Sequence, residues 1–249
     1  KDVAREKPKV KVILMMVPTE ETDGSIGTEF ALNKGIKGDF AICGEPTDLQ
    51  VSFMSKGVLR LNIIVYGKAA HSSRPWLGDN AILKALRVFN EINTLPFTQA
   101  KNEFFGGPTV SLSKLSGGKA INQVPDSAMM DIDIRFLPEQ NPFDILEQIR
   151  GLEKDMEINI IRENQAVKTD RNNILLKELD KCVKLEVPDS KLTVQHGSAD
   201  TRFFQAAGIP SVEFGPVGGG HHGPNEYVEI ASLRQYKNIL MNFIRAIET

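Results

Sequence analysis

Three motifs, each at the end of a predicted strand, carry the residues best suited to bind a metal ion. The doublet Glu20-Glu21 follows an apolar run that ends at Val17, Glu45 follows a second apolar run, and His222 lies in a glycine-rich loop. Sites in open α/β sheets gather at the carboxyl ends of strands. Glutamate oxygens and an imidazole nitrogen are suitable zinc ligands, and a metal hydrolase can use a further carboxylate as its base. Together the motifs favour a metal-hydrolase site.

The adjacent carboxylates of Glu20 and Glu21 have two interpretations. Neighbouring side chains diverge where an extended chain turns over, so one carboxylate can hold a metal while the other faces a substrate. Acidic residues after Pro18-Thr19 also commonly cap the next helix. Similarly, a glutamate before a proline is usually a surface turn residue, and a histidine in a glycine-rich loop is usually solvated. The order of the motifs favours a site over these simpler interpretations.

The sequence lacks the motifs of several other functional classes. The run Gly218-Gly-Gly-His-His-Gly223 is followed by neither Lys-Ser/Thr nor a predicted helix, so it is not a phosphate loop. No GxSxG sequence is present, which argues against a serine hydrolase with a nucleophile elbow. The net charge of -2 gives no support for a nucleic-acid or anionic-membrane partner. No apolar run approaches the length of about 18 residues that spans a bilayer.

The two cysteines, Cys43 and Cys182, are far apart in the sequence and form no CxxC pair. They fit neither a disulfide framework nor a cysteine-rich zinc site. Cys43 lies in an apolar run, which predicts a buried thiol. A reducing cytoplasm is the predicted location.

The outer parts of the chain alternate between predicted strands and helices. In order, these are a strand over 10–17, a helix over 25–34, a strand over 39–43, a helix over 172–185, a strand over 192–195, a helix over 200–206, a strand over 209–214 and a helix over 232–247. Such alternation indicates βαβ construction and a largely parallel sheet.

The middle of the chain follows a different pattern. A strand over 57–66, a helix over 80–92, two strands over 109–115 and 128–136 around Gly117-Gly118, a helix over 143–152 and a strand over 157–161 are predicted. The order β-α-β-β-α-β is that of a ferredoxin-like domain. We therefore expect an α/β domain over 1–54 and 166–249, interrupted by a ferredoxin-like insert over 55–165.

Several motifs in a fixed order carry a resemblance to a known family. They are Pro18-Thr-Glu-Glu21, Gly44-Glu-Pro-Thr47, Gly67–Pro75 with Gly78–Ile82, Asn122-Gln-Val-Pro125, Asp133-Ile-Arg135, Asp200-Thr-Arg202 and His222-Gly-Pro-Asn-Glu226. The chain resembles the M20 family of metallopeptidases and amidohydrolases, and within it the acetylornithine deacetylase and succinyl-diaminopimelate desuccinylase branch. The resemblance implies a zinc-peptidase-like catalytic domain with an inserted lid and dimerisation domain.

The resemblance implies a role for each residue of the outer motifs. Glu20 matches the general base and Glu21 the adjacent metal ligand. Glu45 matches a carboxylate ligand of the other metal, and His222 the C-terminal histidine ligand. The family's centre holds two divalent metal ions, for which we expect zinc, with cobalt as the alternative.

The resemblance also implies substrate contacts. His71 matches a lid histidine that reaches the partner's active site in the family's homodimers and polarises the scissile carbonyl. Asn122 and Arg135 match residues that hold a substrate carboxylate, and Gly197-Ser198 match residues that line the pocket.

Four of the residues on the insert keep simpler alternatives. His71 can be a packed or capping imidazole, and Asn122 a turn residue. Arg135 can form a structural ion pair with Asp131 or Asp133, because alternate strand residues share a face. Trp76 can be a substrate wall, although we expect it to anchor the lid loop.

The sequence departs from the family at one point. An earlier His-x-Asp motif and a later bridging Asp, which supply the other metal ligands, are both absent. Three ligands of five remain, so we expect the chain to be a C-terminal piece of a longer protein with a partial or empty metal site.

The expected activity is hydrolysis of an N-acyl amide or a peptide bond of an amino-acid substrate, and Asp200-Thr-Arg202 leans slightly towards a desuccinylase. A carboxypeptidase or dipeptidase of the same family is the alternative enzyme. The alternative outside catalysis is an inert fragment that dimerises through the insert.

Overall fold

The computed structural model describes residues 2–18 and 24–247. The chain forms two compact units, of which unit 1 comprises Lys1–Ser55 with Gln165–Thr249 and unit 2 comprises Lys56–Asn164. None of the helices in the described ranges combines the length and apolar character needed to cross a membrane.

Unit 1 is built on a mixed β-sheet. Its strands in the described residues are β1 (Ala41–Cys43), β2 (Val51–Ser55), β7 (Val167–Lys168), β8 (Leu192–Gln195) and β9 (Ser211–Glu213). The order is β1-β9-β2-β7, and β8 also pairs with β2. The pairs β1–β9 and β2–β8 are parallel, whereas β2 runs antiparallel to β9 and to β7. The sheet is therefore mixed, where the sequence pattern predicts a largely parallel one.

The reversal that makes the sheet mixed lies between β1 and β2. Asp48 and Leu49 both adopt positive φ angles, 54° and 57°, which non-glycine residues rarely do. Thr47 holds this turn, because its hydroxyl donates to Gln50 O (2.7 Å) and accepts from Gly215 N (3.1 Å). Consequently β2 enters the sheet beside β9 with all of its residues buried.

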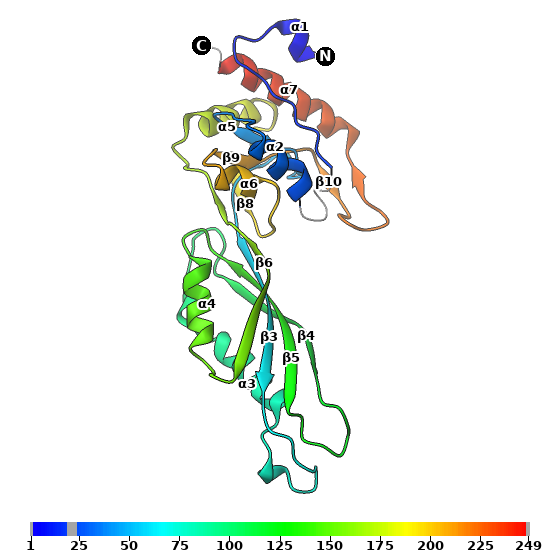
Figure 1. Ribbon diagram of the computed structural model, residues 1–249. Helices are drawn as coiled ribbons and strands as arrows, with labels where there is room; N and C mark the ends of the chain where they lie inside the picture. The colour runs from blue at the N-terminus through cyan, green and yellow to red at the C-terminus, as the bar shows by residue number, and fades with distance from the viewer. Residues whose placement is uncertain (1, 19–23, 248–249) are drawn as a thin grey trace. The chain divides into compact units, whose positions relative to one another are not determined.

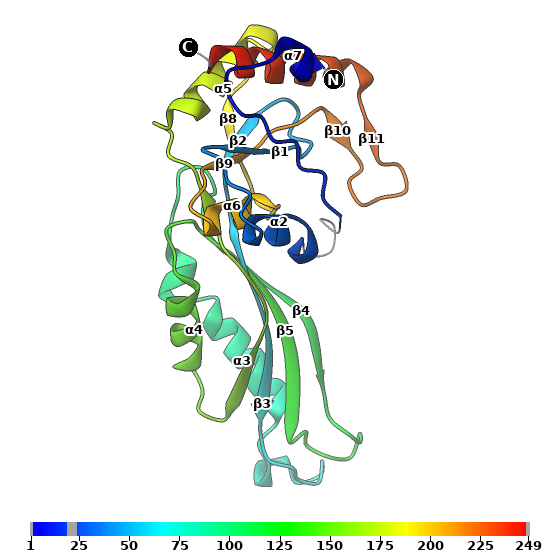
Figure 2. The same ribbon diagram turned by 45° about the horizontal axis from the view of Figure 1, so that its top comes forward.

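Helices cover both sides of this sheet. They are the π-helical turn η1 (Ser25–Glu29), α2 (Phe30–Asn33), α5 (Ile174–Glu186), α6 (Thr201–Ala206) and α7 (Ile230–Ala246). The short helix α1 (Asp2–Glu6) buries no residue and is joined to α7 by ion pairs. Figures 1 and 2 show α5 and α7 on one side of the sheet, and α2 and α6 on the other. Val212, Phe214 and Ile239 are fully buried in this core. The predicted helix over 25–34 is therefore present as η1 followed by α2.

The predicted strand over 10–17 is absent, so that prediction was wrong. The segment has no regular secondary structure, and Leu14 and Met16 are 82% and 87% exposed. Its apolar, β-branched sequence favours a strand, but a strand forms only where a neighbour takes up its backbone hydrogen bonds. In the described residues the edge strand β1 pairs with β9 alone.

Unit 2 has the predicted ferredoxin-like order. Its elements are β3 (Gly57–Tyr66), η2 (Pro75–Leu77), α3 (Ala81–Ile92), η3 (Pro96–Gln99), β4 (Thr109–Gly117), β5 (Ser127–Phe136), α4 (Pro142–Arg150) and β6 (Met156–Asn164). The sheet has the order β4-β5-β3-β6, and every neighbouring pair is antiparallel. The β-α-β-β-α-β prediction is confirmed.

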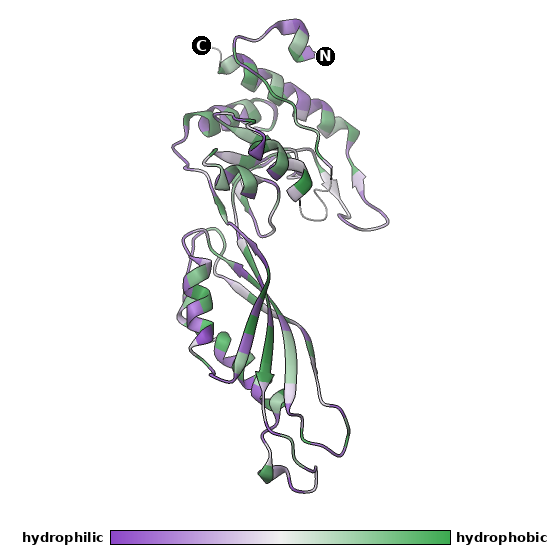
Figure 3. Ribbon diagram, in the orientation of Figure 1, coloured by the Kyte–Doolittle hydropathy of each residue, from purple (hydrophilic) through white to green (hydrophobic). Residues whose placement is uncertain are grey.

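Apolar and polar residues alternate along β3, so the sheet has one buried face and one open face. Leu59, Leu61, Ile63 and Val65 are fully buried, and both helices lie on one side of the sheet in Figure 1. The strand is strongly hydrophobic in Figure 3. Residues between the apolar ones, such as Arg60, point to the opposite face. The period of two is what a sheet with one buried face requires.

Asparagine side chains begin the longer helices. Asn80 Oδ1 accepts from Ile82 N (3.0 Å) and Leu83 N (3.3 Å) at the start of α3. Asn141 and Asn173 cap α4 and α5 in the same way. These caps satisfy N–H groups that the first helical turn leaves unpaired.

Candidate functional site

The doublet Glu20-Glu21 lies outside the described residues, but the segments on both sides of it are described. Gly24 adopts φ +68°, and a Cβ atom there would overlap Asp200 Oδ1. Gly27 lies against the backbone of Pro18 in the same way. Glycine is required at both points because the chain approaches other atoms closely. The doublet is therefore flanked by segments that pack tightly in unit 1.

A buried carboxylate holds the segment that follows the doublet. Asp200 is buried, and its Oδ2 accepts a 2.6 Å hydrogen bond from Thr28 Oγ1. Its other oxygen lies 3.8 Å from Nη2 of Arg202, which is also buried and donates through Nη1 to Ala199 O. A buried charge is stable only when it is paired and hydrogen-bonded. The Asp200-Thr-Arg202 motif is thus a structural connection between α6 and η1.

Glu45 and His222 are the two predicted metal ligands that the structure describes. Glu45 directly follows β1, and its backbone lies so close to Gly215 that a Cβ atom there would overlap it. His222 is exposed and has φ +59° in the loop between the short strands β10 (Gly218–Gly219) and β11 (Tyr227–Val228). Gly218 is adjacent to Pro46, so the structure places the base of this loop beside the Glu45 segment.

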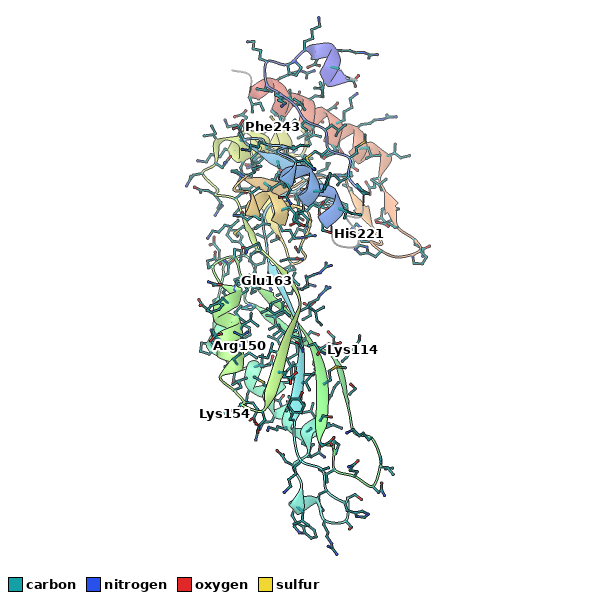
Figure 4. The ribbon with its side chains drawn as sticks, in the orientation of Figure 1. Lys114, Arg150, Lys154, Glu163, His221 and Phe243 are labelled. Atoms are coloured by element: carbon teal, nitrogen blue, oxygen red, sulfur yellow. The ribbon has the colours of Figure 1, made fainter. Side chains whose placement is uncertain are left out.

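The donor atoms in the described residues do not complete a metal centre. No three His, Cys, Asp or Glu side chains come together anywhere in residues 2–18 and 24–247. A carboxylate from Glu45 and an imidazole from His222 have the right chemistry for zinc, but protein zinc sites need three or four such ligands. The neighbouring imidazole, labelled in Figure 4, faces an acid instead, with His221 Nδ1 3.8 Å from Glu226 Oε1.

The loop before α6 carries Gly197 and Ser198. A Cβ atom at Gly197 would meet open space. The hydroxyl oxygen of Ser198 is buried and makes no hydrogen bond within the described residues. A buried hydroxyl without a partner is costly, which suits a position that a ligand completes.

His71 and Asn122 lie together at one end of unit 2. The Ser72 N–H donates to Asn122 O (2.9 Å), and His71 forms an isolated β-bridge with Gln123. The Ser73 N–H donates to His71 Nδ1 (3.2 Å), and the Ser73 hydroxyl lies 2.8 Å from the same nitrogen. Because Nδ1 accepts from an amide, the neutral ring carries its proton on Nε2, an assignment made from the hydrogen bonds. His71 therefore presents an N–H donor to solvent.

Trp76 does not anchor the loop that contains His71. The indole is 75% exposed in the short helix η2, so the expected anchoring role was wrong. The loop is held instead by backbone hydrogen bonds, such as Lys68 N to Asp79 O and Val124 N to Ala70 O.

Arg135 lies at the opposite end of β5 from Asn122. Eight residue steps from Ser127 to Arg135 at about 3.3 Å each give about 26 Å of extended strand. Within one copy of unit 2, Arg135 therefore does not come together with His71 and Asn122. The predicted substrate-binding residues of the insert form two separate groups.

Arg135 makes the ion pair with Asp133 that the strand periodicity allows. Its Nε donates to Oδ1 (2.6 Å) and its Nη2 to Oδ2 (3.2 Å) of Asp133. Arg60 Nε also donates to Asp133 Oδ2 (2.8 Å). Asp131, the other candidate, accepts from Asn62 (2.7 Å) and lies 3.5 Å from the ammonium of Lys114.

The two ionisable groups beside Arg135 have shifted pKa values. Burial alone would raise the pKa of Asp133, but hydrogen bonds from Arg135 and Arg60 outweigh it and lower the pKa below its ordinary value. The pKa of Lys56 is lowered, first by burial and then by the charge of Arg135. Lys56 Nζ donates to Gly107 O (2.6 Å). This end of the sheet is therefore rich in positive charge.

The family model of the M20 peptidase dimerisation domain matches residues 53–159. Unit 2 is therefore similar to the dimerisation domain of M20 peptidases. The match covers nearly all of unit 2 and the last residues of β2.

Two relatives extend the M20 similarity beyond unit 2. A candidate succinyl-diaminopimelate desuccinylase DapE of Mycobacterium tuberculosis is 29% identical over 218 residues, which are 84% of this chain and 60% of the relative. A candidate carboxypeptidase of Aspergillus clavatus is 39% identical over 142 residues, which are 54% of this chain and 34% of the relative. The chain thus spans well under two thirds of the length of either relative.

Two solved structures show the same fold. Aminopeptidase PepT from Bacillus cereus has a TM-score of 0.77 at 18% identity, over 92% of this chain and 62% of that one. The YXEP protein of Bacillus subtilis, described as a dinuclear metal-binding peptidase of the M20 family, has a TM-score of 0.67 at 17% identity. This second match covers 93% of this chain and 64% of that one. At these identities the comparison establishes the fold alone.

Sequence reasoning missed two residues that organise this chain. Thr28 binds the buried Asp200, and Thr47 joins the Glu45 turn to Gly215. Thr47 stands in the Gly44-Glu-Pro-Thr47 motif, which was a usable signal. Thr28 lies 172 positions from Asp200, and nothing in its local sequence points to that partner.

The Thr28–Asp200 bond predicts a stability loss that depends on the hydroxyl. Thr28→Val should lower the free energy of unfolding by about 1–3 kcal/mol, because it leaves a buried carboxylate oxygen without its donor. Thr28→Ser retains the hydroxyl and should lose much less. Urea unfolding followed by circular dichroism measures both variants, and equal losses in the two would contradict this role.

The lowered pKa of Asp133 predicts a pH-dependent contribution. Its folded pKa lies below the unfolded value of about 3.9, so its stabilisation is present above that pH and is lost as the pH falls through the folded pKa. Asp133→Asn should therefore be less stable than the wild type near neutral pH, and the difference should shrink below about pH 4. Urea unfolding across this range tests it, and a constant difference at all pH values would count against the ion pair.

Proposed function

We propose that the intact protein hydrolyses an N-acyl amide or a peptide bond of an amino-acid substrate, as a desuccinylase or deacetylase or as a carboxypeptidase or dipeptidase. The observation that carries the proposal is the match of residues 53–159 to the M20 peptidase dimerisation domain, together with the similarity of the chain to a candidate desuccinylase and a candidate carboxypeptidase. The motif Asp200-Thr-Arg202 was a slight indication of a desuccinylase. In the structure Asp200 pairs with Arg202 inside the motif and accepts a hydrogen bond from Thr28 of η1, and both substrate classes stay within the proposal.

We assign the catalytic roles in this proposal to Glu20 and His71. Glu20 takes the proton of the attacking water and passes it to the leaving amine, which requires a carboxylate beside the scissile bond. The Nε2–H of His71 donates to the oxygen that becomes negative in the transition state. The neutral ring assigned from the Ser73 hydrogen bonds supports that role.

Four further residues contact the substrate in this proposal. Arg135 and Asn122 hold the substrate carboxylate through charge-assisted and neutral hydrogen bonds. Gly197 and Ser198 line the pocket, which the open space at Gly197 and the buried, unbonded hydroxyl of Ser198 support.

The metal ligands in this proposal are Glu21, Glu45 and His222, completed by residues outside this chain. Two divalent ions are supported by the description of the similar Bacillus subtilis protein as a dinuclear metal-binding peptidase. We propose zinc, with cobalt as the alternative. When bound, such ions supply a water that ionises near neutral pH.

The proposed partner is a second copy of the chain, bound through unit 2. His71 and Asn122 lie at one end of β5 and Arg135 at the other, so residues from two copies are needed to bring the two groups to one substrate. The outer edge of β4 pairs with no other described strand, and such an edge is able to pair with another chain. We also propose a cytoplasmic location, because Cys43 and Cys182 are free thiols.

A pair of glutamine substitutions in the full-length protein tests the two carboxylates separately. Glu20→Gln should keep its metals and lose about 10²–10⁴-fold in kcat, because only the proton transfer is removed. Glu21→Gln should lose metal, measured by plasma mass spectrometry after desalting. Near-normal turnover in Glu20→Gln would refute its role as the base.

A second candidate function is that of a non-catalytic fragment that dimerises. It is favoured by the match of residues 53–159 to the M20 peptidase dimerisation domain. Metal analysis and sedimentation of the full-length protein separate the candidates. About two metal ions per chain with amidase activity would support the enzyme, whereas a metal-free dimer without activity would support the fragment.

A further inference from the structure

Cationic side chains gather on the open face of the sheet in unit 2. Arg60 on β3 lies directly opposite Asp133 on β5 and also opposite Arg162 on β6. Directly opposite residues of antiparallel strands point to the same face, and Arg135, two residues along β5 from Asp133, shares that face. Two of these guanidinium groups, those of Arg60 and Arg135, donate hydrogen bonds to the one carboxylate of Asp133.

The charges around Asp131, on the same face of the sheet, are balanced differently from those around Asp133. Asp131 accepts from the neutral amide of Asn62 (2.7 Å) and lies 3.5 Å from the single cation Lys114, which is labelled on β4 in Figure 4. Positive charge is therefore in excess around Asp133 and not around Asp131.

The contacts of Arg135 leave one edge of its guanidinium available. Asp133 takes the edge formed by Nε and Nη2, at 2.6 and 3.2 Å. Nη1 makes no hydrogen bond with any residue in the described part of the chain, and the side chain is 26% exposed. The free edge, formed by Nη1 and Nη2, is a planar pair of donors of the kind that binds a carboxylate through two parallel hydrogen bonds.

A second positive charge, that of Lys56, lies at the same end of the sheet, because the next residue, Gly57, pairs with Phe136, the neighbour of Arg135. Lys56 is only 1% exposed, its ammonium donates to Gly107 O (2.6 Å), and it lies 5.8 Å from the centre of the Phe105 ring. The ammonium is enclosed, so it acts on Arg135 through its electric field and not as a ligand contact. A buried charge is screened less than an exposed one.

We infer that Asp133 is a positioning residue that holds the Arg135 guanidinium so that its Nη1–Nη2 edge receives the free carboxylate of an acylated amino acid. Arg60 neutralises Asp133, so the group retains net positive charge for the incoming anion. The inference rests on the proposed function, because it assigns the geometry with which Arg135 binds substrate. It selects substrates with a free carboxylate over those in which that group is an amide.

The direction in which removal of Asp133 changes anion affinity separates this positioning role from a plain ion pair. If Asp133 were only a nearby negative charge, its removal would strengthen binding of an anion, because a repulsive charge disappears. If Asp133 orients the guanidinium, its removal weakens binding, because Arg135 must then lose side-chain freedom when the ligand arrives. Asp131→Asn is the matched control, since it removes the same charge from the same face without touching Arg135.

The experiment measures binding of N-acetylglycine and of its neutral amide by ligand-observed NMR, using the full chain and its variants. The wild type should prefer the acid. Asp133→Asn should bind the acid about tenfold more weakly and lose the preference, whereas Asp131→Asn should stay within about twofold. Unchanged or tighter binding in Asp133→Asn, or a wild type without a preference, would overturn the inference.

A second variant tests the planar edge itself and does not depend on how Asp133→Asn folds. Arg135→Lys keeps the positive charge and removes the paired donors, so it should lose the preference for the acid as well. Retained preference in Arg135→Lys would overturn the inference. Binding as expected, combined with no hydrolysis by the full-length protein, would count against the proposed hydrolase alone.

Discussion

The ten-residue strand β3, hydrogen-bonded along both edges, is the constraint on which the chemistry of unit 2 depends. Its pairing with β5 and β6 fixes which side chains face the helices and which face outward. Leu59, Leu61 and Ile63 close the core on one side, so Arg60 must point to the other side and meet Asp133. The cationic group on the open face is therefore a consequence of the same alternation that builds the core.

Unit 1 depends on a different kind of restraint. Its segments around the predicted metal ligands are short turns, held by single hydrogen bonds between distant parts of the chain. Thr28 binds Asp200 and Thr47 binds Gly215. Each bond is buried, where it is strong and costly to lose. The candidate site of unit 1 is thus organised by a few specific polar contacts, whereas that of unit 2 is organised by strand register.

Local pattern sufficed for the ferredoxin-like insert, because each of its strands and helices carries its own periodicity and, at Asn80 and Asn141, its own cap. Local pattern failed where the formation of a strand depends on a neighbouring strand. The apolar run over 10–17 has the composition of a strand but no described neighbour. The strand β2 was missed because its buried serines hide its burial. The turn at Asp48-Leu49, which reverses it, uses backbone angles that sequence does not reveal.

For the candidate site, the sequence predicted residue types but not their burial or their contacts. Cys43 is only half-buried, although its apolar run predicted a buried thiol. Residue types alone left Arg135 with two possible acidic partners. In the structure Arg135 pairs with Asp133, whereas Asp131 contacts Asn62 and Lys114. The separation of Asn122 from Arg135 follows from the length of β5 and not from the spacing of their motifs. The roles assigned to the individual site residues stay predictions.

The length of β5 sets the distance between the two ends of unit 2. Adding one residue to each strand of the sheet would turn every side chain to the opposite face. Adding two would restore the faces but lengthen the sheet by about 7 Å, which would increase the separation of Arg135 from His71 and Asn122. Substitutions that keep the alternation therefore disturb this sheet less than insertions within its strands, whereas insertions in the loops at its two ends leave the register unchanged.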